Sequence, residues 1–219
     1  MGTEIDLLKN YPRVNRDVNQ RASAKSDEVR KIARKFGYEY FDGDRAYGYG
    51  GFSYNPKFWG EVVKDIASFY HLDESSSILD VGCGKGFMLY DFKRLLPGLS
   101  VRGIDISEYA IANSKYEVSD VLSVGNAKDL PFPDNSFDLV LSINTIHNLD
   151  EFECSQALKE IERVTRKDAF VVVDAFASHE EEKRMYDWNL TALTIKSTSD
   201  WKDFFSNCGY THDYYWFKP

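Results

Sequence analysis

Apolar residues follow two alternating patterns along this chain. Short, nearly continuous apolar runs predict the buried strands of a parallel sheet. These runs lie at residues 78–81, 101–106, 121–124, 137–143 and 169–174. The stretches between them place apolar side chains every three or four positions, as amphipathic helices do. Strands that alternate with helices predict an α/β fold, with a Rossmann-like, mostly parallel sheet and helices on both faces.

The N-terminal third follows a different pattern. Ser26 is placed to cap a helix that ends at Gly37, and residues 58–69 carry an apolar stripe at helical spacing. Between them, residues 38–54 mix aromatic side chains with glycines, which makes a poor helix and an awkward strand. Such a segment is either a surface loop packed on the sheet or a mobile lid, and the density of glycine favours a lid. We therefore expect an N-terminal helical and aromatic cap at 1–73 and a Rossmann-like domain at 74–219.

The two ends of the chain are less sharply patterned. Residues 1–25 are polar, which fits a flexible segment or one that lies over the core. Beyond residue 174 the pattern predicts a helix from 197 to 209 and a closing strand at 214–217. Residues 190–195 fit either a short strand or a flap beside the substrate.

The composition of the chain disfavours several classes of binding partner. The 219 residues carry a net charge of −8 without a basic run, which disfavours nucleic acids and acidic membrane surfaces as partners. Cys83, Cys154 and Cys208 are odd in number and widely spaced, so neither a disulfide framework nor a metal site is predicted. No apolar segment has the length of a membrane span or the pattern of a signal peptide, and we expect a cytoplasmic protein. No feature predicts an oligomeric state.

The first strand of the predicted sheet runs into glycines at alternate positions, Gly82, Gly84 and Gly86, with Cys83 between the first two. A strand, a glycine turn and a helix in this order are typical of a nucleotide-type cofactor site, because the turn is tight and leaves backbone N–H groups free. The spacing differs from the dinucleotide fingerprint G-x-G-x-x-G. Asp80, at the strand end, would repel a pyrophosphate and attract a cation. These features oppose an NAD-dependent reductase, while a turn without any ligand is the remaining alternative.

A second acid, Asp105, closes the next strand about twenty residues later and is followed by Ile106. A Rossmann-type fold places there the carboxylate that accepts both ribose hydroxyls. With D-V-G-C-G-x-G and this acid, the chain resembles the class I S-adenosylmethionine-dependent methyltransferases, closely over residues 74–175 and loosely beyond. The resemblance implies S-adenosylmethionine as cofactor, with its methionine and ribose part on the glycine turn and its ribose bound by Asp105.

The same resemblance implies further contacts to the cofactor. The family often has an acid at the position of Asn126 to accept from the adenine amino group, and the amide oxygen of Asn126 can still accept. Ala127 is expected to approach the adenine through its backbone. Some members carry a tyrosine-containing segment before the first motif that contacts the cofactor, which we carry over to Tyr47 and Tyr49.

The fourth predicted strand ends at Asn144, three residues before His147. Ligands lie beyond the C-terminal strand ends of such sheets, so Asn144 is expected at the cofactor and His147 is the best-placed general base. A lone histidine there is also often a packing residue. The family's N-P-P-Y motif is absent, which disfavours nucleobase and glutamine acceptors. The sequence thus predicts a methyltransferase of the EC 2.1.1 class acting on a small molecule. A catalytically inactive cofactor-binding regulatory protein is the alternative.

Overall fold

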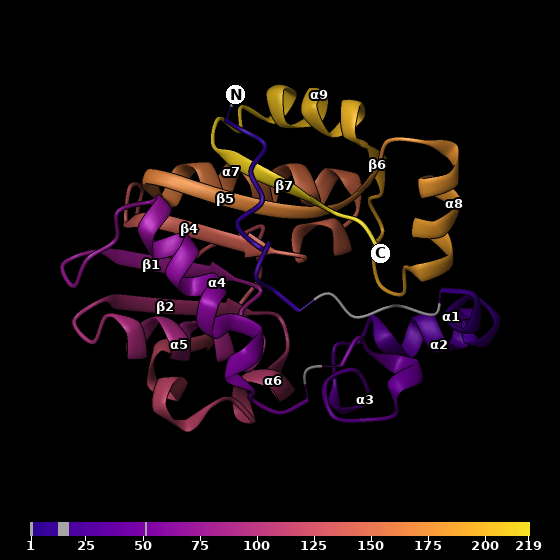
Figure 1. Ribbon diagram of the computed structural model, residues 1–219, viewed down its shortest axis with the longest axis horizontal. Helices are drawn as coiled ribbons and strands as arrows, with labels where there is room; N and C mark the ends of the chain where they lie inside the picture. The colour runs from indigo at the N-terminus through magenta and orange to yellow at the C-terminus, as the bar shows by residue number, and fades with distance from the viewer. Residues whose placement is uncertain (1, 13–17, 51) are drawn as a thin grey trace.

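The computed structural model describes residues 2–12, 18–50 and 52–219. The described part of the chain forms a seven-stranded sheet in the order β3-β2-β1-β4-β5, with β6 and β7 both on the far edge of β5 (Figure 1). Every strand pairs in parallel with its neighbours. The strands are β1 (Ser77–Val81), β2 (Ser100–Asp105), β3 (Leu122–Val124), β4 (Phe137–Ile143), β5 (Thr165–Phe176), β6 (Lys196–Ser197) and β7 (Asp213–Phe217). The Rossmann-like, mostly parallel sheet predicted from the sequence is confirmed.

Helices cover both faces of the sheet, as predicted. On one face, α4 (Pro56–Phe69) and α5 (Phe87–Leu95) pack on a core that includes Ile78, Leu139 and Phe170. On the other face, α7 (Glu151–Val164) and α9 (Thr198–Cys208) pack on the alternate strand residues, such as Leu79 and Val140. Successive strand side chains point to opposite faces, so strands buried on both sides need the continuous apolar runs seen in the sequence.

Two elements differ from the sequence-based expectation. Residues 190–195 form no strand and connect α8 to β6 through bends at 190, 191 and 193. Helix α8 (His179–Trp188) was not predicted, because only Met185 and Trp188 of its side chains are buried. The remaining short elements are α1 (Val18–Ala24), α2 (Asp27–Ala33), α3 (Tyr38–Phe41), α6 (Glu108–Ala112) and the 3₁₀ turns η1 (Arg45–Tyr47), η2 (Tyr116–Val121) and η3 (Ile146–Asn148).

The N-terminal segment lies along the free edge of β7. The N–H of Ile5 donates to the carbonyl of Tyr214 at 3.0 Å, and the N–H of Tyr214 donates to the carbonyl of Thr3 at 3.1 Å. Of the two possibilities for residues 1–25, the described residues 3–5 therefore lie over the core. Pairing of this kind occupies backbone groups that an edge strand would otherwise leave open.

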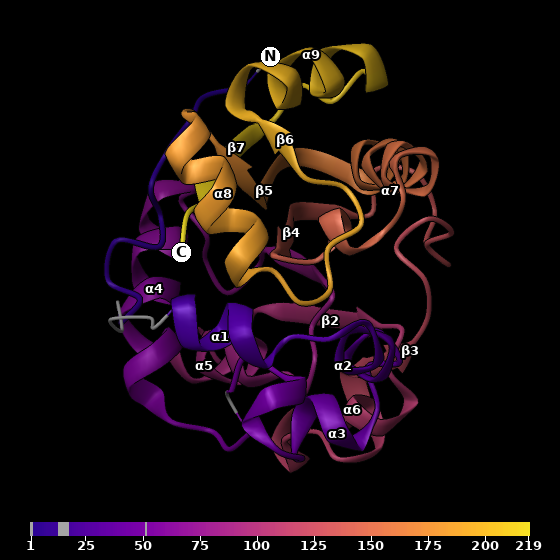
Figure 2. The ribbon, with the colours of Figure 1, turned by 90° about the vertical axis from the view of Figure 1, so that its right-hand side faces the viewer.

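Helices α1, α2 and α3 form a separate layer beside α6 and α8, at the end of the sheet where the parallel strands finish (Figures 1 and 2). Basic side chains join this layer to the segment after α8. Lys25 donates to the carbonyls of Asp187 and Asn189 at 3.1 and 3.0 Å, and Arg34 donates to those of Thr191 and Ala192 at 3.1 and 3.2 Å. The bond to Asp187 satisfies a carbonyl in the last turn of α8, and the other bonds hold the segment that follows the helix.

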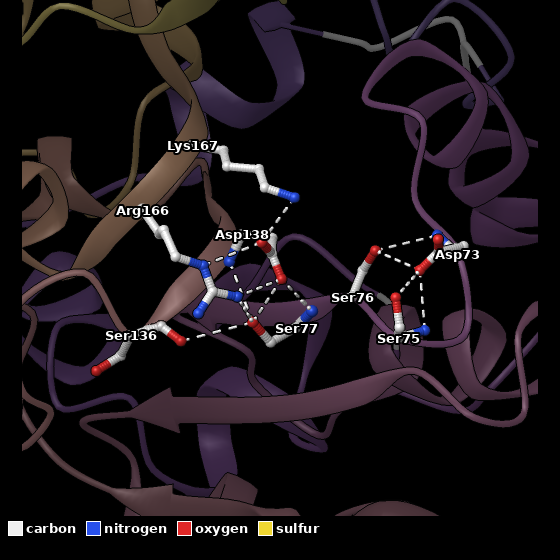
Figure 3. Close-up of polar contacts among 8 residues, drawn as sticks. All are labelled: Asp73, Ser75, Ser76, Ser77, Ser136, Asp138, Arg166 and Lys167. Carbon is white, nitrogen blue, oxygen red and sulfur yellow. Dashed lines mark hydrogen bonds and ion pairs between the residues drawn. The ribbon is translucent and has the colours of Figure 1, made fainter.

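At the opposite end of the sheet, Asp138 links the starts of three strands (Figure 3). Its carboxylate accepts from the backbone and hydroxyl of Ser77, both at 2.9 Å, and lies 2.6 Å from Arg166 and 3.0 Å from Lys167. Burial alone would raise the pKa of Asp138, but these donors outweigh it and hold the pKa well below its usual range. Within the described ranges, no helix is long and apolar enough to cross a membrane.

Candidate functional site

A cavity of about 1470 Å³ lies between the C-terminal strand ends and the N-terminal layer. It contains all the residues predicted for the site except Gly86 and Tyr47. The predicted residues that line it are Asp80, Gly82, Cys83, Gly84, Asp105, Ile106, Asn126, Ala127, Asn144, Tyr49 and His147. The strand ends of β1, β2, β4 and β5 all contribute, as expected for an open parallel sheet.

The glycine turn adopts a backbone that other residues rarely take. Gly82, Gly84 and Gly86 have φ angles of +88°, +53° and +76°, in the left-handed region that favours glycine. A Cβ on Gly82 would also lie 2.0 Å from the Thr145 hydroxyl oxygen. Gly86 precedes α5, and a Cβ there would meet Leu122, which explains why it serves the turn without lining the cavity.

Asp105 is fixed by the turn that it faces. Its Oδ2 accepts from the N–H of Gly84 at 2.7 Å, and its Oδ1 accepts from the N–H of Ser107 at 2.8 Å. Burial raises its pKa, and these two bonds oppose the rise. A carboxylate has about four acceptor positions, so Asp105 can still accept from two ligand hydroxyls.

Asp80 is a buried acid with no hydrogen-bonding partner in the described part of the chain. It is 4% exposed and makes no hydrogen bond with any residue that the structure describes. Burial, together with the charge of Asp105, raises the pKa of Asp80 to about 8. An acid in this position takes up either a proton or a cationic group of a ligand, and a cation would stabilise its charged form.

Residues of the N-terminal layer close over the glycine turn. Lys85 is 8% exposed, and its Nζ lies 2.6 Å from both carboxylate oxygens of Asp42 and 3.1 Å from the carbonyl of Phe52. The hydroxyl of Tyr109 on α6 also donates to Asp42 at 2.7 Å. One acid of the segment at 38–54 is thus held by both the turn and α6.

The two tyrosines predicted to contact the cofactor have different surroundings. The hydroxyl of Tyr49 accepts from the N–H of Leu190 at 2.6 Å, and the guanidinium of Arg21 lies 5.2 Å from the centre of its ring. Tyr49 therefore lines the cavity while it anchors the connection after α8. Tyr47, in η1, is not among the residues that line the cavity.

His147 is turned toward the end of β5. Its Nδ1 accepts from the backbone N–H of Asp174 at 3.1 Å, and its Nε2 lies 3.8 Å from Oδ1 of the same residue. Burial lowers the pKa of His147, although Asp174 opposes this, so the ring is neutral at pH 7. In the neutral ring, the bond to Nδ1 places the proton on Nε2. A role as base would require this hydrogen bond to break.

Part of this chain is similar to a known family of proteins. Residues 79–173 match the family model described as a methyltransferase domain. The chain is 35% identical to a demethylmenaquinone methyltransferase from Symbiobacterium thermophilum over 116 residues, 49% of this chain and 45% of that protein. It is 31% identical to a tRNA (carboxymethyluridine(34)-5-O)-methyltransferase from Arabidopsis thaliana over 145 residues, 65% of this chain and 33% of that protein.

The chain spans less than half the length of both relatives. A solved SAM-dependent methyltransferase from Methanosarcina mazei shares the fold, with a TM-score of 0.53 at 23% identity over 65% of this chain and 82% of that one. Over residues 79–173 this chain is similar to the methyltransferase-domain family, and the shared fold agrees with a class I S-adenosylmethionine-dependent methyltransferase. The resemblance noted in the sequence is confirmed.

The cofactor of the family is S-adenosylmethionine, and the cavity suits it. Its ammonium group would supply the cation that the buried, unpartnered Asp80 lacks, and its ribose hydroxyls match the acceptor positions left on Asp105. Asn144 has a left-handed backbone, with φ +54°, at the point where β4 meets the cavity. Strained positions of this kind cluster at functional sites of enzymes.

The cavity also contains residues that the sequence analysis did not single out. Tyr40 lines it, and its hydroxyl makes no hydrogen bond within the described ranges. Burial is the main cause of the raised pKa of Tyr40, with contributions from Tyr49, Asp105 and Asp174. Asp174 itself, at the end of β5, also lines the cavity. Asp174 was visible in the sequence only as the last residue of a predicted strand.

Proposed function

We propose that this protein transfers the methyl group of S-adenosylmethionine to a small-molecule acceptor. The observation that carries the proposal is the pair of buried carboxylates, Asp80 and Asp105, on either side of a left-handed glycine turn. When bound, the cofactor supplies an electrophilic methyl group on a sulfonium. The chain's part is to position both reactants and to exclude water, since in-line displacement depends chiefly on orientation.

Most of the residues predicted to contact the cofactor have a proposed role in this function. Asp80 binds the ammonium group, while the turn from Gly82 to Gly86 carries the methionine and ribose part. Asp105 accepts from the ribose hydroxyls. The adenine side of the site is proposed to comprise Ile106, Asn126 and Ala127. Residues 1–73, which include Tyr47 and Tyr49, act as a cap over the domain at 74–219.

A small acceptor is supported by the net charge of −8, which disfavours nucleic acid. The N-terminal layer reaches the glycine turn through Asp42 and Lys85, which narrows access from that side. One relative is named as a tRNA methyltransferase, so the exclusion of nucleic acid stays a prediction. An assay with labelled cofactor would compare methyl uptake by a metabolite panel with uptake by total tRNA.

Titration calorimetry tests the cofactor site directly. We expect heat from S-adenosylmethionine and S-adenosylhomocysteine and none from NAD or NADP. If Asp80 is protonated before binding and ionised afterwards, binding at pH 7 releases a proton. The measured heat then differs between phosphate and Tris buffers, which have different ionisation enthalpies. Asp80→Asn should remove this buffer dependence. Tight NAD binding without binding of either sulfur compound would overturn the proposal.

A further inference from the structure

Asp174 is a second acidic centre in the cavity, apart from the pair at the cofactor turn. It lies two strands away from Asp80, because β4 separates β5 from β1. Neighbouring strands are about 4.8 Å apart, so the two strand ends are separated by roughly 10 Å. Asp174 is 4% exposed and lines the same cavity. A ligand group beside Asp174 would therefore be next to the cofactor but would not be part of its proposed ammonium and ribose contacts.

The charge of Asp174 has no cationic partner among residues 2–12, 18–50 and 52–219. Its Oδ2 accepts from the side-chain nitrogen of Asn189 at 2.8 Å. Its Oδ1 faces only the Nε2 of His147, at 3.8 Å, which is too long for a hydrogen bond. His147 is neutral at pH 7, so it adds no compensating charge. A buried carboxylate in this state is costly unless a cation from outside the chain approaches it.

Other groups around this side of the cavity are oxygen acceptors. The side-chain oxygen of Asn148 is buried without a hydrogen-bond partner, while its nitrogen donates to the carbonyl of Asn144 at 3.2 Å. That bond identifies which end of the amide is free to accept. The hydroxyl of Tyr40 is also without a hydrogen bond in the described part of the chain. These oxygens would suit a ligand rich in N–H donors.

Two of the basic residues that line the cavity, Arg21 and Arg34, have their guanidinium groups engaged by backbone carbonyls. Arg34 donates from Nε and Nη2 to the carbonyls of Thr191 and Ala192, and Arg21 donates from Nη2 to that of Gly48 at 2.8 Å. These guanidinium groups tie loops together. Beside Asp174, an anionic acceptor would be repelled by the carboxylate, whereas a cationic acceptor would be attracted to it.

We infer that the methyl acceptor is a primary or secondary amine, held as its ammonium form by Asp174 beside the cofactor site. This inference rests on the proposed methyltransferase function and names the acceptor class for the same site. The ammonium must first give one proton to the Asp174 carboxylate. The nitrogen lone pair then forms the new N–CH₃ bond as the S–CH₃ bond breaks and its electron pair stays on sulfur. The proton leaves Asp174 for solvent when the product departs.

Binding measurements with matched probes test this assignment. The protein saturated with S-adenosylhomocysteine is titrated with benzylamine and n-butylamine, and with benzyl alcohol and n-butanol as neutral counterparts. We expect the amines to bind and the alcohols to bind at least tenfold more weakly. Asp174→Asn keeps the size of the side chain and should weaken amine binding about tenfold to hundredfold, as loss of a charge-assisted hydrogen bond does. Asp203→Asn, a surface change of the same kind, should have no effect.

The same titrations distinguish failure of the amine assignment from failure of the proposed methyltransferase function. Binding of S-adenosylhomocysteine by Asp174→Asn within about twofold of the native value would show that the variant is folded with an intact cofactor site. Labelled methyl transfer should then appear in amine products and not in alcohols. Equal binding of alcohols and amines, or unchanged amine binding in Asp174→Asn, would overturn the amine assignment while leaving the methyltransferase proposal standing. Failure of the native protein to bind S-adenosylhomocysteine would overturn the function itself.

Discussion

The side-chain nitrogen of Lys85 lies 2.6 Å from the carboxylate of Asp42, and this contact joins the glycine turn to the N-terminal layer. Asp42 is 25% exposed at its side chain and Lys85 is 8% exposed, so water screens the pair only partly. Lys85 occupies the position written x in the motif D-V-G-C-G-x-G. Movement of the segment at 38–54 would therefore break a contact with the cofactor turn itself.

Limited trypsin digestion tests whether this segment is a lid. Lys35, Arg45 and Lys57 lie within or beside it. We expect rapid cleavage at these residues without cofactor and protection with S-adenosylhomocysteine, because closure removes the bonds from solvent. Asp42→Asn should reduce the protection, while Glu39→Gln, an exposed change on α3, should not. Equally slow cleavage with and without cofactor would show that the segment is a fixed part of the packing.

Asp105→Ala should weaken binding of S-adenosylhomocysteine. Each hydrogen bond from a ligand hydroxyl to a carboxylate contributes about 1.5–3 kcal/mol, so the dissociation constant should rise at least roughly tenfold to hundredfold. Asp105→Asn keeps one acceptor and should give a smaller rise. Asp120→Asn, an exposed acid, is the control. Calorimetry gives the constants, and an unchanged value for Asp105→Ala would remove this residue from the site.

His147→Ala tests the predicted general base. If His147 is the base, turnover should fall about 10²–10⁴-fold while cofactor affinity stays the same. Because burial lowers the pKa of His147, the native ring stays neutral below its ordinary pKa of about 6.5. Turnover should then decline only at pH values below that ordinary pKa, as the pH falls through the lowered pKa of His147.

His147→Asn separates the two possible roles of this residue. Asparagine can still accept from the N–H of Asp174, as Nδ1 does at 3.1 Å in the native protein, but it cannot act as a base. Low turnover in both variants would support the base. Recovery of turnover in His147→Asn would show that the ring only positions the end of β5.

Asp138→Asn should lower the free energy of unfolding at pH 7 by about 1–3 kcal/mol, because it removes a buried charge that accepts several hydrogen bonds. Since the folded-state pKa of Asp138 is lowered, its contribution is present above the unfolded pKa of about 3.9 and is lost as the pH falls through the folded value. The difference between variant and native protein should therefore shrink below about pH 4. Urea melts at several pH values would measure it, and a difference independent of pH would contradict the assignment.

The sequence predicted the strand ends well because each end is marked by neighbouring residues. Asp80, Asp105 and Asn144 each follow an apolar run, and parallel strands bring such ends to one edge. The sequence predicted that the fifth strand begins at residue 169, whereas β5 begins at Thr165. The first residues of β5 are polar and pair with the start of β4, so they lack the apolar run that marks a buried strand.

Contacts between distant segments could not be predicted in this way. Which tyrosine of the aromatic segment faces the cavity depends on where α3 and η1 place the backbone. The family resemblance suggested Tyr47 and Tyr49 and gave no indication of Tyr40. The surroundings of Asp174 depend on Asn189 and His147, which come from other elements. Only the folded structure, which brings Asp174, Asn189 and His147 together, reveals that neither neighbour gives the carboxylate of Asp174 a cationic partner.

The N-terminal pairing on β7 has a consequence for solubility. β7 carries the uncharged aromatic run Tyr214, Tyr215, Trp216 and Phe217, and residues 3–5 occupy backbone groups on its outer edge. Without those residues, the strand would present open N–H and C=O groups next to aromatic side chains, a combination that favours pairing between molecules. A deletion of residues 2–6 should therefore leave the cofactor turn untouched and yet make the protein aggregate as its concentration rises.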